Sequence, residues 1–224
     1  MKRIILVYHD LGENDKFLQV SLNDFHKHIN YLLSKKYNFC DIDEILNAKK
    51  GKNIAIMFDD ALINIKDAIK IMEEKKLKYN IAVITNNLDN KKYLREEELL
   101  KLNYASLYFH TFNHLDLTKL DENKLIEELT IKKNYLNSKY IVYPMGKYNE
   151  NVIDNCKKQG FDYGLTVLPF HIPKKFNKYK IPRICINGYL DFNKFKFFMY
   201  KIGNFYLHAA FLKRKILRQD YLGK

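Results

Sequence analysis

The sequence predicts an α/β fold in which parallel strands form either a barrel or a doubly wound sheet. Short apolar runs of strand length alternate along the chain with segments of helical periodicity, as in successive βαβ units. These runs lack a strict apolar–polar alternation, which is typical of parallel strands covered on both faces. The 224 residues suit one domain, and the 47% of hydrophobic residues supply a sizeable core.

Seven apolar runs are predicted as strands because each has the length of a buried strand. They are, in chain order, Ile4–Tyr8, Ile54–Phe58, Asn80–Thr85, Ala105–Phe109, Tyr140–Tyr143, Tyr163–Val167 and Ile181–Ile186. In parallel α/β folds the functional groups gather where strands end. The residues that follow these runs are therefore the first candidates for a site.

The segments between the runs are predicted as helices. Ser21 can cap the first helix, with Asp24 three residues on, and an apolar stripe follows. Similar stripes run through Ile65–Met72, Glu96–Leu102 and Leu125–Leu136. Asn149 is expected to begin a short helix that Gly160 ends.

The composition bears on location and partners. No segment reaches the ~20 apolar residues of a membrane span, and the N-terminal apolar run is too short for a signal peptide. We therefore expect a cytoplasmic location for the sequence as given, unless a leader was removed. The net charge of +13 indicates attraction to nucleic acid, an anionic membrane or an acidic glycan, although a genome rich in Lys and Asn explains it equally. Lysines are spread without a recognition motif, so no nucleic-acid partner is predicted.

Two adjacent carboxylates, Asp59 and Asp60, follow the strand Ile54–Phe58. Placing both charges behind an apolar strand is costly unless a cation meets them, and a metal ion is the simplest such cation. The alternative is a helix-capping pair, because Asp is also favoured at helix N-termini. This motif alone does not separate the two interpretations.

His110 and His114 follow the strand Ala105–Phe109 and are four residues apart. Two His at this spacing can share one face of a helical turn and bind one ion of the zinc type. The alternative is a pair of surface or capping histidines. With Asp60 they make a set of two imidazoles and one carboxylate, which leaves coordination positions open for water and substrate. Asp59 is then available as a general base.

Three further strand ends carry candidate groups. His9, which Asp10 follows, can donate a proton if a carboxylate holds its tautomer, or it can simply bond to backbone. The loop 143–149 contains Pro and Gly and can aim a backbone N–H at an oxyanion. Arg183 lies in the last strand and is expected to pair with a carboxylate, either in the site or in a structural ion pair.

In this order the motifs resemble those of the NodB-type polysaccharide deacetylases, carbohydrate esterase family 4, over roughly residues 4–187. The matching motifs are Phe58-Asp59-Asp60, His110-Thr111-Phe112-Asn113-His114-Leu115-Asp116-Leu117 and Tyr143-Pro144-Met145-Gly146-Lys147-Tyr148-Asn149. The early Tyr8-His9-Asp10 resembles the branch that deacetylates poly-N-acetylglucosamine, in which the motif order is circularly permuted.

The resemblance implies an irregular (β/α)7-type barrel with parallel strands over residues 1–190. It implies a hydrolase of carbon–nitrogen bonds in linear amides, which removes N-acetyl groups from an N-acetylated sugar or polysaccharide. It also implies a divalent metal, with zinc as the first candidate. The implied roles are metal ligands for Asp60, His110 and His114, base for Asp59, acid for His9, oxyanion donor for the Met145 N–H, and support of Asp59 for Arg183.

Several positions depart from the family pattern. An aromatic residue is usual where Met145 stands, and no Arg precedes Pro144, so Arg183 is the candidate to support Asp59. Ala61 stands where Gly is usual, so a different turn is expected there. Tyr108 and Phe109 replace small residues and are expected to narrow the site. These departures leave open a catalytically degenerate member that binds a glycan or an anionic lipid. The sugar, the polymer length and the metal are not specified by the sequence.

Residues 191–224 are predicted to form a separate, basic and amphipathic helical segment. Its apolar residues recur at helical spacing and are Phe192, Phe195, Met199, Ile202, Phe205 and Leu212. Its basic residues are Lys194, Lys196, Lys201, Lys213, Arg214, Lys215 and Arg218. Such a helix can lie on an anionic membrane through residues 191–218. The plainer alternative is that the stripe packs against the barrel, so burial of the stripe separates the two interpretations.

Overall fold

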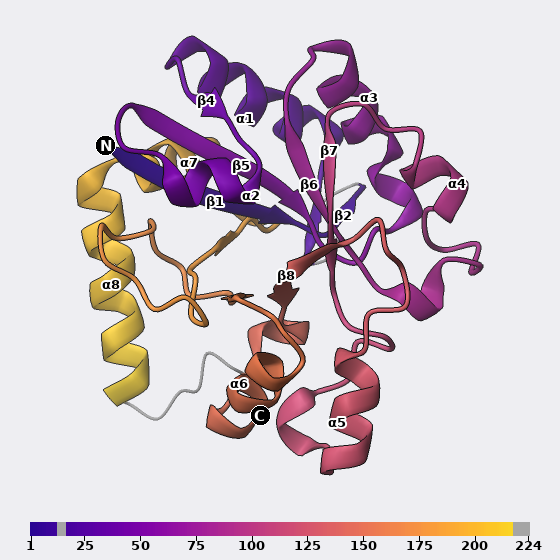
Figure 1. The fold of residues 1–224 in the computed structure, drawn as a ribbon. Helices are drawn as coiled ribbons and strands as arrows, with labels where there is room; N and C mark the ends of the chain where they lie inside the picture. Colours follow the sequence, from indigo (N-terminus) through magenta and orange to yellow (C-terminus); the bar gives the residue numbers. More distant parts are fainter. Residues whose placement is uncertain (13–16, 217–224) are drawn as a thin grey trace.

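The computed structural model describes residues 1–12 and 17–216, and within them parallel strands form a barrel (Figure 1). The strands run in the order β10-β1-β5-β6-β7-β8-β9. They are β1 (Lys2–Tyr8), β5 (Lys52–Phe58), β6 (Tyr79–Val83), β7 (Ala105–Phe109), β8 (Asn137–Val142), β9 (Tyr163–Leu165) and β10 (Ile184–Cys185). Ile181, just before β10, forms a parallel bridge with Leu165 of β9, and this bridge joins the two ends of the sheet. The predicted irregular barrel of parallel strands is confirmed.

All seven predicted strands are present, with ends that shift by a few residues. The longest pairing is between β1 and β5, which run in register from Lys2–Lys52 to Tyr8–Phe58. Three short strands were not predicted because two residues are too few to show a period: β2 (Asp10–Leu11), β3 (Gln19–Val20) and β4 (Asn38–Phe39).

Helices form the outer layer around the strands (Figure 1). They are α1 (Leu22–Ser34), α2 (Ile42–Asn47), α3 (Lys66–Glu74), α4 (Glu96–Leu99), α5 (Glu122–Leu129), α6 (Glu150–Lys158), α7 (Phe192–Phe198) and α8 (Lys201–Ile216), with short 3-10 turns η1 (Ile63–Ile65), η2 (Thr85–Asn87), η3 (Leu117–Lys119) and η4 (Pro144–Gly146). The predicted starts are confirmed, because Ser21 accepts from the Asp24 N–H and Asn149 accepts from the Val152 N–H.

Two predicted helices are shorter in the structure than their apolar stripes, and the smaller difference is at α4, which ends at Leu99 rather than Leu102. The stripe Leu125–Leu136 predicted a helix to residue 136, whereas α5 ends at Leu129. Thr130 adopts an extended conformation there, and its hydroxyl donates to the Ile126 carbonyl. A hydroxyl that bonds to the backbone in this way competes with the next helical hydrogen bond, so the helix ends.

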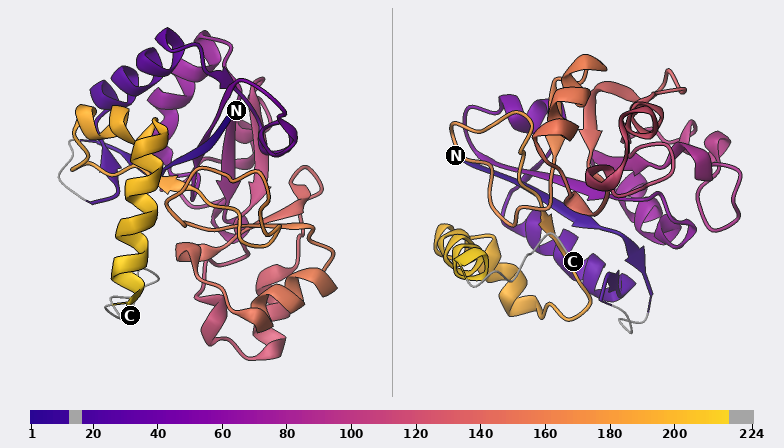
Figure 2. Two further views of the ribbon diagram at one scale, coloured as in Figure 1. Left: turned by 90° about the vertical axis from the view of Figure 1, so that its left-hand side faces the viewer. Right: turned by 90° about the horizontal axis from the view of Figure 1, so that it is seen from below.

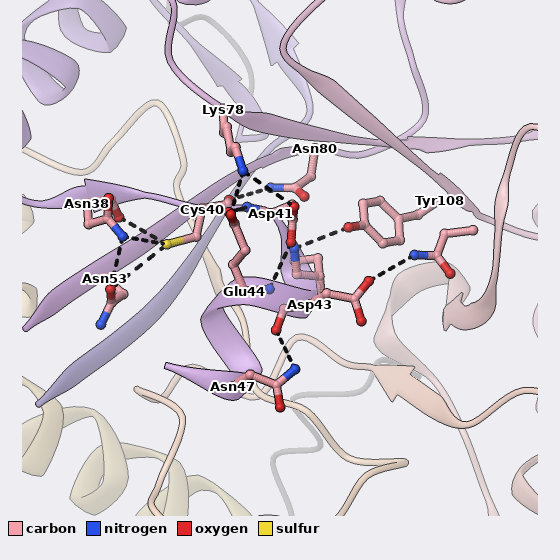
Figure 3. A network of polar contacts seen from close by, with 12 residues as sticks. Asn38, Cys40, Asp41, Asp43, Glu44, Asn47, Asn53, Lys78, Asn80 and Tyr108 are labelled. Carbon is pink, nitrogen blue, oxygen red and sulfur yellow. Dashed lines mark hydrogen bonds and ion pairs between the residues drawn. The ribbon is translucent and has the colours of Figure 1, made fainter. Parts of the chain in front are cut away.

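The short helix α2, which was not predicted, is tied to the barrel by polar contacts at the amino ends of several strands (Figure 3). The Ile42 N–H donates to the Tyr108 hydroxyl, and the Asn80 amide donates to the Cys40 carbonyl. Tyr108 therefore packs inside the barrel against α2, and the Phe109 ring stacks on Phe161. Both rings are used in packing, which corrects the expectation that they narrow the site.

The predicted C-terminal stripe divides into two parts. Phe195 and Met199 are buried, and the Phe195 ring stacks on His28 of α1 at 3.8 Å between centroids. Ile202, Phe205 and Leu212 of α8 are exposed. The interpretation that the stripe packs against the barrel therefore holds for Phe195 and Met199 and fails for the stripe residues of α8. Residues 217–224 of this predicted segment lie outside the described residues, and its boundary at residue 190 stays a prediction.

Gly203 lies within α8 and does not interrupt this helix, although glycine disfavours the helical conformation. The chain turns before it, at Met199 and Tyr200, between α7 and α8. A Cβ atom on Gly203 would lie 2.0 Å from the Phe197 carbonyl oxygen, so the missing side chain lets the two helices approach closely. Among the described helices we find none with the length and apolar character needed to cross a bilayer.

Candidate metal and catalytic site

The candidate residues lie at the carboxyl ends of neighbouring strands. His9 follows β1, Asp59 and Asp60 follow β5, and His110 follows β7. The ends of β1 and β5 are joined by the Asp59 N–H, which donates to the Tyr8 carbonyl. Because β1 and β5 are adjacent and only β6 separates β5 from β7, and all of them are parallel, the residues after them converge at one end of the barrel.

The structure brings the three predicted metal ligands together. Asp60 Oδ1 lies 3.3 Å from His110 Nε2 and 3.5 Å from His114 Nε2. One potential ligand atom of each residue lies within 4.8 Å of the other two. Ligands bound to one zinc-like ion at about 2.0–2.2 Å lie up to about 4.4 Å apart, so both Asp60–His distances fall within that span.

The hydrogen bonds of this cluster fit a cation between its members. His110 Nδ1 lies 2.9 Å from the Val142 carbonyl oxygen, which can only accept, so Nδ1 carries a hydrogen. The lone pair of a neutral His110 then points from Nε2 toward Asp60 Oδ1. That oxygen is buried and makes no well-directed hydrogen bond with the described residues. Two lone pairs at this distance repel each other unless a cation or a proton lies between them, and the donor set suits a divalent transition metal.

The neighbouring imidazoles set the charge of Asp60. Burial by itself raises the pKa of a carboxyl group. Here His110, together with His9 and His114, outweighs burial and holds the pKa of Asp60 well below its usual range. Asp60 is therefore a carboxylate at neutral pH, which is the form that binds a metal ion.

Asp59 is held by a buried ion pair with Arg183. Arg183 Nη1 lies 2.7 Å from Asp59 Oδ1, and its Nε donates to the Thr166 carbonyl at 2.8 Å. Burial raises the pKa of Asp59, but Arg183, with His110 and His9, outweighs it and lowers that pKa. Arg183 was expected to pair with a carboxylate either in the site or in a structural ion pair. Both descriptions apply, because this buried ion pair lies in the site and fixes one oxygen of Asp59.

His9 faces the second oxygen of Asp59, with His9 Nε2 3.9 Å from Asp59 Oδ2. The other nitrogen, Nδ1, is buried and has no hydrogen-bond partner among the described residues. The adjacent Asp10 does not orient this ring, because its carboxylate accepts from Gln19 and Asn64 at 3.0 Å each. The carboxylate that faces His9 is Asp59.

Two other histidines, His171 and His208, are alternative candidates for a proton donor, but they lie at the opposite end of the barrel. His171 and His208 line a cavity together with Met1 and Lys2, where β1 begins. His9 follows β1 where it ends. A strand of seven residues rises about 3.3 Å per residue, so roughly 20 Å separates the two ends. Of these three histidines, only His9 faces the carboxylates.

Backbone strain is concentrated in the loops of this site. Five of the non-glycine residues with positive φ belong to it: Asp60 (69°), Ala61 (57°), Thr111 (65°), His114 (63°) and Met145 (55°). Each such residue costs about 1–2 kcal/mol, and such strain persists where the surrounding structure holds a functional geometry. Ala61 adopts the left-handed conformation that favours glycine, so the departure at this position adds strain.

Two supporting contacts were not predicted. Glu128 of α5 is buried and accepts from the Asn113 N–H at 3.0 Å and from the Asn113 amide at 2.6 Å, so it holds the loop between the two histidines. Lys147 pairs with Asp116 at 2.8 Å and joins this loop to η4. A signal for Glu128 was present, because an acid on the apolar face of a helix needs a buried partner.

Comparison with known proteins places these residues in a wider group. A family model described as "Polysaccharide deacetylase" matches residues 47–164, which include Asp59, Asp60, His110 and His114 but not His9. The Bacillus subtilis (strain 168) protein YxkH is 26% identical over 198 residues, which cover 82% of this chain and 71% of that protein. The poly-beta-1,6-N-acetyl-D-glucosamine N-deacetylase of Staphylococcus aureus (strain MSSA476) is 29% identical over 201 residues, covering 77% and 69%.

Solved structures share the fold. The Streptococcus pyogenes deacetylase PplD superposes with a TM-score of 0.77 at 21% identity, covering 85% of this chain and 95% of that chain. BC0361, a polysaccharide deacetylase from Bacillus cereus, superposes with a TM-score of 0.79 at 22% identity, covering 89% and 69%. IcaB from Ammonifex degensii gives 0.66 at 16% identity, covering 88% and 95%. At these identities the likeness is one of fold.

Proposed function

This chain belongs to the polysaccharide deacetylase family, and from that premise we propose that it is a metal-dependent hydrolase that removes N-acetyl groups from an N-acetylated sugar or polysaccharide. One observation carries the metal dependence. The buried Asp60 Oδ1 lies between two imidazole nitrogens without a directed hydrogen bond, beside the ion-paired carboxylate of Asp59.

The proposed roles follow from charge and position. Asp60, His110 and His114 would hold a divalent cation, with zinc the first candidate; when bound, it supplies Lewis-acid activation of water and of a carbonyl oxygen. Asp59 accepts the proton of the attacking water, because Arg183 keeps it ionised and leaves its second oxygen facing the site.

Two further groups complete the proposed reaction. His9 in its protonated form gives a proton to the nitrogen of the leaving amine, which is otherwise a poor leaving group. The Met145 N–H, at the strained turn of η4, is the proposed donor to the tetrahedral oxyanion. In this proposal Asp59 takes up a proton and His9 delivers one. His9 Nε2 lies 3.9 Å from Asp59 Oδ2.

Acetate release tests this proposal. The substrates are N-acetylglucosamine, its β-1,4 oligomers and its β-1,6 oligomers, each with and without a chelator. The β-1,6 oligomers are included because the name of the staphylococcal relative states that linkage. We expect acetate from at least one substrate, and loss of release with the chelator. A metal-loaded protein that binds an oligomer but releases no acetate from any substrate would contradict turnover and favour a degenerate, glycan-binding member.

His9→Ala is expected to lower acetate release by about 10²-fold or more, because it removes the proton donor to the amine. The metal content should stay at the wild-type level, since His9 is not one of the three ligands. The matched control is His26→Ala, an exposed histidine on α1. Near-wild-type release from His9→Ala, or a comparable loss in His171→Ala, would remove His9 from the acid role.

A further inference from the structure

Helix α8 exposes an apolar stripe on its outer face. Ile202, Phe205 and Leu212 are 68%, 74% and 55% exposed, and Ala209 lies between the last two. Their spacing of three or four residues puts them on one face of the helix. Figures 1 and 2 show α8 at the edge of the molecule, beside α7. An exposed apolar patch of this kind marks a surface that another apolar phase covers.

A basic cavity of about 350 Å³ borders this stripe. Its charged and polar walls come from two sides of the molecule, with Lys201, Asn204 and His208 on α8 and Lys2, Arg3 and Lys174 opposite. No Asp or Glu is among its lining residues. Lys201, Asn204 and His208 lie at spacings of three and four residues, each directly before or after a residue of the stripe, so cavity and stripe adjoin.

Arg3 lies in the wall of this cavity. Its side chain is only 4% exposed, and it donates to the carbonyls of Leu46 and Pro173. Its Nε is buried and has no hydrogen-bond partner among the described residues. With Lys2, Lys174 and Lys201, this guanidinium makes the cavity wall positively charged, which attracts a phosphate group.

The positive charge of this surface distinguishes among three candidate partners, namely a second copy of this chain, a nucleic acid and a lipid bilayer. The sequence contains no Asp or Glu between Asp191 and Asp220, and the whole chain carries a net charge of +13. A second copy of this chain would bring like charges together, and a nucleic acid would leave the apolar stripe in water. An anionic lipid bilayer satisfies both features, because it offers phosphate to the cavity and an apolar phase to the stripe.

We propose that α8 docks this protein on an anionic lipid bilayer, with the stripe at the acyl boundary and a lipid phosphate in the cavity. The cavity lies where β1 begins, whereas His9 and Asp59 lie where β1 and β5 end. Docking therefore leaves the candidate active site open to substrate. The proposal does not rest on turnover, since it concerns the opposite end of the barrel.

Vesicle sedimentation of the full chain tests this proposal. The vesicles are phosphatidylcholine alone and phosphatidylcholine with phosphatidylglycerol. We expect binding only with phosphatidylglycerol, and weakening with salt as the Debye length falls from about 10 Å at 0.1 M to about 3 Å at 1 M. Phe205→Ser should weaken binding roughly tenfold or more, and Lys201→Gln about fivefold.

Matched controls use exposed residues of the same kind elsewhere on the molecule. Leu100→Ser, at a position that is 56% exposed, and Lys70→Gln on α3 should bind like the wild type. The proposal is overturned if the wild type does not sediment with anionic vesicles at low salt, if neutral vesicles bind it equally, or if Phe205→Ser and Lys201→Gln bind like the wild type. A dimer that Phe205→Ser dissociates in sedimentation velocity would also overturn it. Acetate release from a soluble substrate should be unchanged in these variants, so failure of docking and failure of turnover are distinguishable.

Discussion

Asp59→Asn is expected to lower acetate release by about 10²-fold or more while the protein keeps its metal. The amide cannot take the proton of the attacking water, and Asp59 is not among the three clustered ligand residues. The measurements are the rate of acetate release and the metal content of the purified protein. The matched control is Asp154→Asn on α6, whose carboxylate pairs with Lys157 at the surface.

This substitution also leaves Arg183 without its anionic partner. Removing one member of a buried ion pair typically costs 3–5 kcal/mol, so a lower melting temperature is expected for Asp59→Asn, and rates are compared well below it. Release near the wild-type rate would show that Asp59 is not the base. Loss of the metal together with turnover, in a protein that remains folded, would make Asp59 a ligand instead.

His114→Ala is expected to weaken metal binding by more than about 10–100-fold. Loss of a residue that only hydrogen-bonds to a metal ligand already lowers metal affinity by that factor, and His114 is a proposed ligand itself. Turnover should fall in parallel at low metal concentration. His114 suits the test because its side chain is 28% exposed, whereas His110 and Asp59 are buried. The measurements are a metal titration of the apoprotein and acetate release at each metal concentration.

Excess metal separates a ligand from a proton carrier. Acetate release by His114→Ala should recover in part as the metal concentration rises, since a carboxylate and one imidazole remain. Release by Asp59→Asn and His9→Ala should not recover. Unchanged affinity in His114→Ala, with His26→Ala as the control for loss of a surface imidazole, would place the metal elsewhere or exclude it.

The sequence by itself determined the strands, most of the helices and the candidate ligands. Apolar runs and helical stripes are local properties, so the seven strands and the helix starts at Ser21 and Asn149 follow from the sequence without any tertiary contact. Because parallel strands converge at their carboxyl ends, residues placed directly after strands, such as Asp60 and His110, were expected to meet.

Only the tertiary structure decided the partners of the buried charges. Asp59 and Arg183 are 124 positions apart, and closure of the barrel beside β1 puts them 2.7 Å apart. Glu128 likewise meets Asn113 because α5 packs under the histidine loop. The C-terminal stripe has one period, yet its residues Phe195 and Met199 are buried whereas Ile202, Phe205 and Leu212 on α8 are exposed. Periodicity defines the face of a helix, whereas the turn at Met199–Tyr200 and the space left by neighbouring elements define what that face contacts.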